Sequence, residues 1–119
     1  MIQHYLIRPE SLNHAGNLFG GRLLSWADET AYMTAIQAYP NCEFVTRALE
    51  ATDFKSPAVN GDLVELTGKV VETGETSCKV SISARNVTTG KEVFSTDFIM
   101  VNVINGHKEP IPKGSRPTT

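Results

Sequence analysis

The sequence predicts an α+β domain in which a curved antiparallel sheet of about five strands wraps around one long central helix. Residues 20–38 carry apolar side chains at helical spacing, whereas the chain after residue 44 alternates between apolar and polar residues. Short turns join the alternating segments, which indicates an antiparallel meander. The helix is apolar on more than one side and therefore needs cover, which the apolar face of such a sheet supplies.

The individual elements follow from local signals along the chain. A short β-prone run at residues 4–7 is limited by Pro9, and a loop then leads to the helix, whose start is marked by Gly20 and Gly21. The helix ends before Pro40, because proline lacks a backbone donor and disfavours the helical conformation in the residue before it. Further strands are expected at residues 44–54, 63–71, 77–85 and 92–104.

Length and composition exclude several classes of protein. The 119 residues suit one domain, which we place at residues 1–105, with residues 106–119 as an extended or disordered tail that has little to bury. The net charge of -2 provides no basic surface for nucleic acid. No apolar run reaches the roughly 20 residues of a membrane helix, and the first residues lack the pattern of a signal peptide, so we expect a cytoplasmic protein.

The two cysteines, Cys42 and Cys78, are expected to be free thiols. Cys78 lies in an alternating strand pattern, and neither cysteine belongs to a Cys-x-x-Cys motif or to a histidine cluster. We therefore expect neither a disulfide nor a metal site.

One residue of the helix breaks its pattern. The main apolar arc consists of Leu24, Ala27, Ala31, Ala35 and Ala38. Asp28 falls inside this arc, whereas Arg22, Ser25 and Glu29 occupy the opposite, polar face. We therefore expect the Asp28 carboxylate to be buried, either as a functional acid or as a structural one bonded to backbone or to a partner subunit.

A sheet that wraps one helix leaves an edge strand and part of the helix exposed. Pairing two copies edge to edge would cover both surfaces. We expect an obligate dimer or a larger assembly of dimers.

Two segments, NHAGNLFGGRLLSWADE and FVTRALEATDFKSPAVNGD, resemble the hotdog-fold acyl-CoA thioesterases of the cytosolic acyl-CoA hydrolase type. The resemblance covers residues 5–103 and is most specific in a set of residues at fixed spacing: Asn13, Gly16, Gly20, Gly21, Asp28, Phe54, Pro57, Gly61 and Asp62. It implies the hotdog fold and the hydrolysis of acyl-CoA to a free carboxylic acid and CoA. It implies no cofactor, since coenzyme A is part of the substrate and the product.

The resemblance also suggests a role for each catalytic candidate. Asp28 is the general base or a nucleophile that forms a transient anhydride. The Gly21 N–H, at the helix start beside Gly20, is the donor to the oxyanion. Asn13 matches the family's catalytic asparagine, which orients water or the carbonyl. The structural alternatives are a buried paired acid, a glycine pair that permits a tight helix entry, and an asparagine in a turn.

Further residues are candidates for substrate binding. By resemblance the acyl-CoA cleft uses Thr46 and Arg47 at the start of the strand after the helix, and Thr76 and Ser77 at a hairpin. In the family, the Asn and Asp of one site come from different subunits, and the subunits commonly form a trimer of dimers. The expected partners are therefore acyl-CoA and further copies of this chain, as a dimer or hexamer.

Two other functions remain open at this point. One is a non-catalytic acyl-CoA-binding or regulatory hotdog module, in which Asp28 is only structural. The other is a hotdog hydratase or dehydratase, which needs a catalytic histidine paired with an acid. The chain offers His4, His14 and His107 for that purpose.

Overall fold

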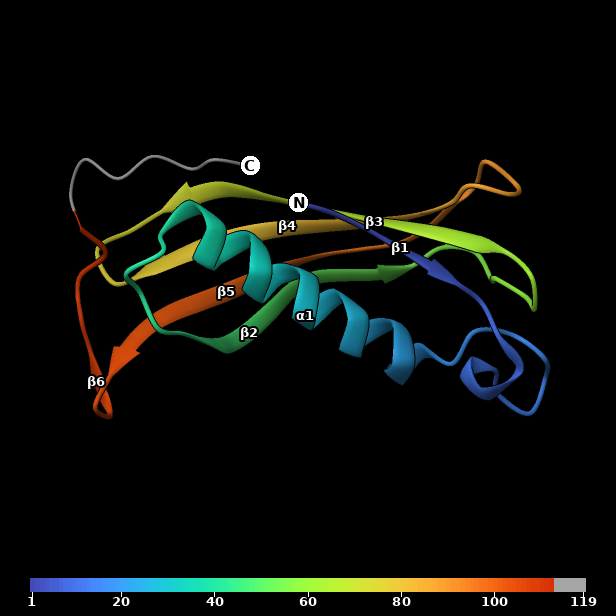
Figure 1. Cartoon of the computed structure of the whole chain (residues 1–119), viewed down its shortest axis with the longest axis horizontal. Coiled ribbons are helices and arrows are strands. Elements are labelled where there is room, and N and C mark those ends of the chain that lie inside the picture. The colour runs from blue at the N-terminus through green and yellow to red at the C-terminus, as the bar shows by residue number, and fades with distance from the viewer. Residues whose placement is uncertain (113–119) are drawn as a thin grey trace.

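The computed structural model describes residues 1–112, in which one α-helix lies across a six-stranded antiparallel sheet (Figure 1). The elements are β1 (Ile2–Leu6), a 3₁₀ turn η1 (Pro9–Ser11), α1 (Gly20–Ala38), β2 (Phe44–Phe54), β3 (Leu63–Thr73), β4 (Ser77–Asn86), β5 (Glu92–Ile104) and β6 (His107–Lys108). The strand order is β1-β3-β4-β5-β2, and the short β6 pairs with β5. The predicted fold class is confirmed, while β1 begins two residues earlier than expected and β6 was not expected.

The sheet buries the face of α1 that is made of Leu23, Ala27, Thr30, Ala31, Thr34, Ala35 and Ala38. The expectation that Asp28 lies on the buried face is wrong: Asp28 is exposed and Leu24 is half-buried. The buried face of α1 is rotated relative to the predicted apolar arc, because it includes two threonines. The Thr30 hydroxyl donates to the Trp26 carbonyl at 2.8 Å, and the Thr34 hydroxyl donates to the Thr30 carbonyl at 2.7 Å. Both polar groups are thereby satisfied inside the core.

Small residues allow α1 to lie close to the sheet. Gly68 is buried on β3, beneath α1, and a Cβ atom added there would overlap the Thr34 hydroxyl and lie 3.0 Å from the Ile82 side chain. The glycine is therefore required by the approach of the helix. This close packing fixes the position of α1 over the sheet, and with it the groove described below.

We expect Gly68→Ala to lower the free energy of unfolding by about 1–3 kcal/mol, because the added methyl group forces Thr34 or the whole helix to move. Urea denaturation measures the loss. Gly74→Ala is the control, since a Cβ there would lie 3.6 Å from its nearest neighbour, an ordinary contact. The double variant Gly68→Ala with Thr34→Ala should recover part of the lost stability. If Gly68→Ala and Gly74→Ala were equally stable, the packing argument would be contradicted.

Asp62, one of the residues shared with the family pattern, fixes a turn. Its Oδ2 accepts hydrogen bonds from the Val59 N–H at 3.0 Å and from the Asn86 side-chain amide at 2.8 Å. Asn86 is fully buried, and its own Oδ1 accepts from the N–H groups of Thr88 and Thr89. This network joins the turn before β3 to the β4–β5 hairpin, so Asp62 has a structural role.

The segment after β5 is partly packed within the described residues. Ile111 is buried, and its N–H donates to the Glu75 carbonyl at 2.7 Å. The Asn102 amide donates to the Glu109 carbonyl at 3.1 Å and its Oδ1 accepts from the Glu43 N–H. The expectation of a tail with little to bury therefore misses Ile111, and for residues 113–119, which lie outside the described residues, it stays a prediction.

Candidate active site

A groove runs between α1 and β2. The chain turns back soon after the helix, so β2 returns alongside α1 as the edge strand of the sheet (Figure 1). Its central part has a volume of about 410 Å³ and is lined by Gly21, Leu24, Ser25, Asp28, Thr46, Leu49 and Phe98. The groove thus brings together three of the residues that the sequence singled out, namely Gly21, Asp28 and Thr46.

Asp28 is held by Thr46. The Thr46 hydroxyl donates to Asp28 Oδ1 at 2.5 Å, which is a short bond, as expected for a donor on a carboxylate. Within residues 1–112, no hydrogen bond engages the other oxygen, Oδ2. Asp28 is thus held through one oxygen in a groove that it lines, and its other oxygen stays available. It is thereby prepared to accept a proton from water or to attack a carbonyl.

The helix start offers a backbone donor to the same groove. The N–H groups of Arg22 and Leu23 both donate to the Phe19 carbonyl, whereas the Gly21 N–H has no acceptor among the described residues. A Cβ added at Gly21 would lie 3.5 Å from the Phe19 ring, an ordinary contact. Packing within the chain therefore does not require glycine here. Because Gly21 has no side chain, it leaves its backbone uncovered where it lines the groove. Gly20 precedes it, against the Phe54 ring.

Asn13 lies in the loop before the helix and away from Asp28. Its Oδ1 accepts from the N–H groups of Ala15 at 2.9 Å and Asn17 at 3.1 Å, which makes it the anchor of a turn. The side-chain NH₂ group is exposed and bonds to no other group in residues 1–112. Asn13 does not line the Asp28 groove, so one chain does not bring these two candidates together. The side-chain NH₂ group of Asn13 therefore remains available as a hydrogen-bond donor.

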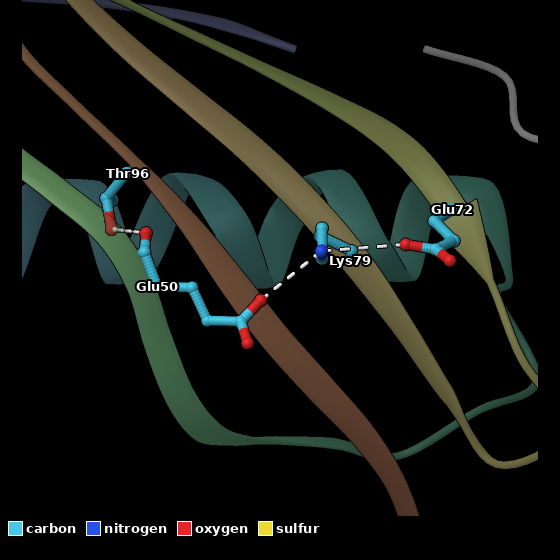
Figure 2. Close-up of polar contacts among 4 residues, drawn as sticks. All are labelled: Glu50, Glu72, Lys79 and Thr96. Atoms are coloured by element: carbon cyan, nitrogen blue, oxygen red, sulfur yellow. Dashed lines mark hydrogen bonds and ion pairs between the residues drawn. The ribbon is translucent and has the colours of Figure 1, made fainter.

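Two of the residues expected to bind coenzyme A lie on the other face of the sheet. Arg47 and Ser77 line a groove of about 270 Å³. There the Lys79 ammonium lies between the carboxylates of Glu50, at 3.3 Å, and Glu72, at 3.6 Å; these side chains point away from α1 (Figure 2). Thr76 contributes its carbonyl to the Asn102 N–H at 2.9 Å. The candidates for substrate binding therefore divide between two faces.

The sequence reading missed the place of Ser25. This exposed residue was assigned to the polar face of the helix, but its side chain lines the central groove and both neighbouring depressions. One depression, about 370 Å³, also contains Glu10 and Arg22; the other, about 510 Å³, contains Tyr32 and Val45. Ser25 follows Gly21 by one helical turn and precedes Asp28 by three residues, a spacing that could have placed it on their face.

None of the three histidines lines the groove in the described part of the chain. His4 instead pairs with Glu65 at 2.9 Å, across β1 and β3.

Over residues 1–112, no group of three or more His, Cys, Asp or Glu side chains is arranged to hold a metal ion. No helix in this part of the chain combines the length and the apolar character needed to cross a membrane.

Both cysteines are buried free thiols. Burial raises the pKa of Cys42, and it raises the pKa of Cys78 to about 11, with a smaller contribution from Cys42 nearby. Thiols of this kind react slowly, because the thiolate is the reactive form.

The raised pKa of Cys78 predicts a loss of stability in alkali. Burial of the neutral thiol stabilises the fold fully below the ordinary pKa of 9.0, and this contribution is lost as the pH rises through about 11. We expect a decrease of up to about 2 kcal/mol in the free energy of unfolding over that interval, measured by urea denaturation. In Cys78→Ala the decrease should be smaller. An identical pH dependence in the two proteins would contradict the assignment.

The comparisons with known proteins agree on one family. Residues 15–93 match the family model described as the Thioesterase superfamily. The uncharacterized acyl-CoA thioester hydrolase YkhA of Bacillus subtilis is 30% identical over 109 residues, which cover 87% of this chain and 62% of that protein.

Solved structures are similar over nearly all of the described chain. An apo-hexameric acyl-CoA thioesterase is 38% identical, with a TM-score of 0.84, over 94% of this chain and 74% of that chain. A hexameric hotdog fold thioesterase of Campylobacter jejuni is 30% identical, with a TM-score of 0.82, over 93% of this chain and 89% of that chain. These similarities confirm the hotdog fold.

Proposed function

Because this chain belongs to the Thioesterase superfamily, we propose that it hydrolyses acyl-CoA to a free carboxylic acid and CoA. The observation that carries the proposal is the Asp28 carboxylate, held by Thr46 in a groove that Gly21 also lines. Thioester hydrolysis needs an activated water or a nucleophile, and donors for the oxyanion. The thiol leaves readily because its pKa is near 8.5, so no strong acid is required.

In the proposed mechanism, Asp28 acts through its free Oδ2. It takes a proton from the water that attacks the thioester carbonyl, or it attacks that carbonyl itself and forms an anhydride that water then hydrolyses. In both routes the C–S bond breaks, CoA leaves as the thiolate and takes up a proton, and the Thr46 hydroxyl fixes the carboxylate. The Gly21 N–H, aligned with the positive end of the helix, stabilises the negative charge on the carbonyl oxygen. The Asn13 side-chain NH₂ group supplies a further donor that orients the carbonyl or the water. No cofactor takes part.

We propose that the site is completed by a second copy of the chain. β2 is an edge strand that exposes Val45, Leu49 and Phe54, with 49%, 41% and 53% of each residue accessible. Pairing of two β2 edges would cover these residues and bring the second copy beside the Asp28 groove. The similar structures named above are described as hexameric, which fits a trimer of such dimers.

Coenzyme A is proposed to contact both faces of the sheet. Thr46 lines the groove where the thioester is proposed to react, and Gly20 precedes Gly21 at the helix start. Arg47 and Ser77, with Thr76 beside Ser77, are proposed to bind the nucleotide end in an assembly that brings the second groove next to the first. The cytoplasm is the proposed location; a human protein that is 27% identical over 92 residues, which cover 71% of this chain and 24% of that protein, is described as a cytosolic acyl coenzyme A thioester hydrolase.

The test is a thiol-release screen with DTNB over short, medium, long and aromatic acyl-CoA esters. We expect turnover with at least one ester class. The slow reaction of Cys42 and Cys78 keeps the background low. Tight acyl-CoA binding without thiol release from any ester would contradict hydrolysis and favour the binding module. Hydration of an enoyl-CoA would favour the hydratase instead.

A further inference from the structure

We propose that the Ser25 hydroxyl, together with Asp28 Oδ2, holds the water molecule that attacks the thioester. The inference rests on the proposed thioesterase function and deepens it, because it takes Asp28 as the general base and adds the residue that positions the water.

Ser25 lies where three depressions along α1 meet. Of the described residues, it alone lines all three of them, whereas Gly21 lines the first two and Asp28 the last two. Because a helix rises by about 1.5 Å per residue, Ser25 lies about 6 Å beyond Gly21 and about 4.5 Å before Asp28. A substrate that extends along α1 from Gly21 to Asp28 therefore passes Ser25. This placement depends on the helix alone and not on what covers the β2 edge.

The hydroxyl of Ser25 is not used by the fold. Hydroxyl groups inside a helix often donate to the carbonyl one turn earlier, as Thr30 and Thr34 do at 2.8 and 2.7 Å. Ser25 is exposed, and its hydroxyl bonds to no other group within residues 1–112, the Gly21 carbonyl included. One donor and two acceptor positions are therefore available to a water molecule in the groove.

The spacing of Ser25 and Asp28 suits one bridging water. Side chains three residues apart on a helix are neighbours, with Cβ atoms about 5–6 Å apart. No direct hydrogen bond joins these two side chains in the described structure. Two hydrogen bonds of about 2.8 Å each, made through a single water, span such a distance. Since Thr46 bonds to Oδ1, the oxygen that accepts from this water is Oδ2.

Ser25 is a poor candidate for the nucleophile itself. A serine nucleophile needs a base within hydrogen-bond reach, yet in the described part of the chain no histidine lines the groove and Ser25 is not bonded to Asp28. The water therefore forms the new C–O bond while its proton passes to Asp28 Oδ2. The C–S bond then breaks, and the CoA thiolate takes up that proton.

The experiment compares kcat and KM for thiol release in the full chain, in Ser25→Ala, in Asp28→Asn and in the double variant. We expect Ser25→Ala to lower kcat by about tenfold to a hundredfold with a smaller change in KM, because the substrate still binds and the water is poorly held. The double variant should react within about threefold of Asp28→Asn, since both substitutions act on the same water.

Stability separates this role from a structural one. Alanine favours the helix more than serine does, so the thermal midpoint of Ser25→Ala should not decrease while kcat does. Ser83→Ala is the matched control. Ser83 is exposed on β4 and lies outside the lining of all three depressions, so its variant should keep kcat within about twofold.

Three results would overturn the inference while hydrolysis stands. They are a kcat of Ser25→Ala within about twofold of the wild-type value, a change in KM alone, and losses that multiply in the double variant. Absence of thiol release by the wild-type chain from every ester would instead overturn the proposed function, and this inference with it.

Discussion

Asp28→Asn should lower kcat/KM for acyl-CoA hydrolysis by about a hundredfold to ten-thousandfold, the range typical for loss of a general base. The substitution keeps the shape of the side chain and removes its charge. Asp28 is exposed and is not part of the core cluster, so the fold should persist. Thiol release gives the rate, and circular dichroism with a thermal melt checks the fold.

Glu29→Gln is the matched control for this prediction. Glu29 is the next residue on α1, is also exposed, and lines the far end of the groove near Tyr32. Its variant should keep activity within about threefold, as expected for a group that only modifies the local field. If Glu29→Gln were inactive and Asp28→Asn active, the base would have to be Glu29.

Thr46→Val separates the positioning of the carboxylate from its chemistry. The variant has nearly the same volume but cannot donate to Asp28 Oδ1. Hydrogen bonds to charged groups contribute about 1.5–3 kcal/mol, so kcat should decrease by about tenfold to a hundredfold, with a smaller change in KM. A change in KM alone would show that Thr46 binds substrate and does not position Asp28.

The fold could be predicted where local signals are strong. The glycine pair and Pro40 bracket α1, and the bounds of β2 and β5 agree with the expected ones, because alternation and turn residues mark both ends. The two-residue β6 carries no periodic signal. Ile111 is buried through a contact with the β3–β4 hairpin, which is distant in sequence and leaves no trace in local composition.

The site was predicted less completely, for two physical reasons. Hydropathy counts threonine as polar, yet Thr30 and Thr34 bond to the carbonyls one turn before them and enter the core, which rotates Asp28 out of it. The bond between Asp28 and Thr46 joins residues 18 positions apart. It depends on the alignment of β2 with the helix, which no local pattern encodes. The sequence made Asp28 a candidate, whose role stays a prediction, but assigned it the wrong environment.

The second large effect concerns Asn13, whose role stays a prediction because one chain leaves it apart from Asp28. We expect Asn13→Ala and Asp28→Ala to be nearly inactive when each is assembled alone, with losses of about a hundredfold or more. When the two variant chains are unfolded, mixed in equal amounts and refolded together, about a quarter of the wild-type activity should return.

The recovery follows from counting sites. Random pairing makes half of the dimers mixed, and a mixed dimer has one site with both lesions and one site with neither. Half of the dimers with half of their sites intact gives a quarter of the activity. A mixture of Asp28→Ala with Asp28→Asn is the control, since every site then carries a lesion, and it should recover nothing.

The geometry explains why recovery is expected. The Asn13 Oδ1 is committed to Ala15 and Asn17, so only its NH₂ group is free, and that group does not reach the groove of its own chain. The exposed β2 edge beside Asp28 is where a second copy would bring such a donor. If the mixture showed no more activity than the separate variants, Asn13 and Asp28 would not be shared between subunits. The exposed NH₂ group of Asn13 would then belong to its turn and not to the reaction.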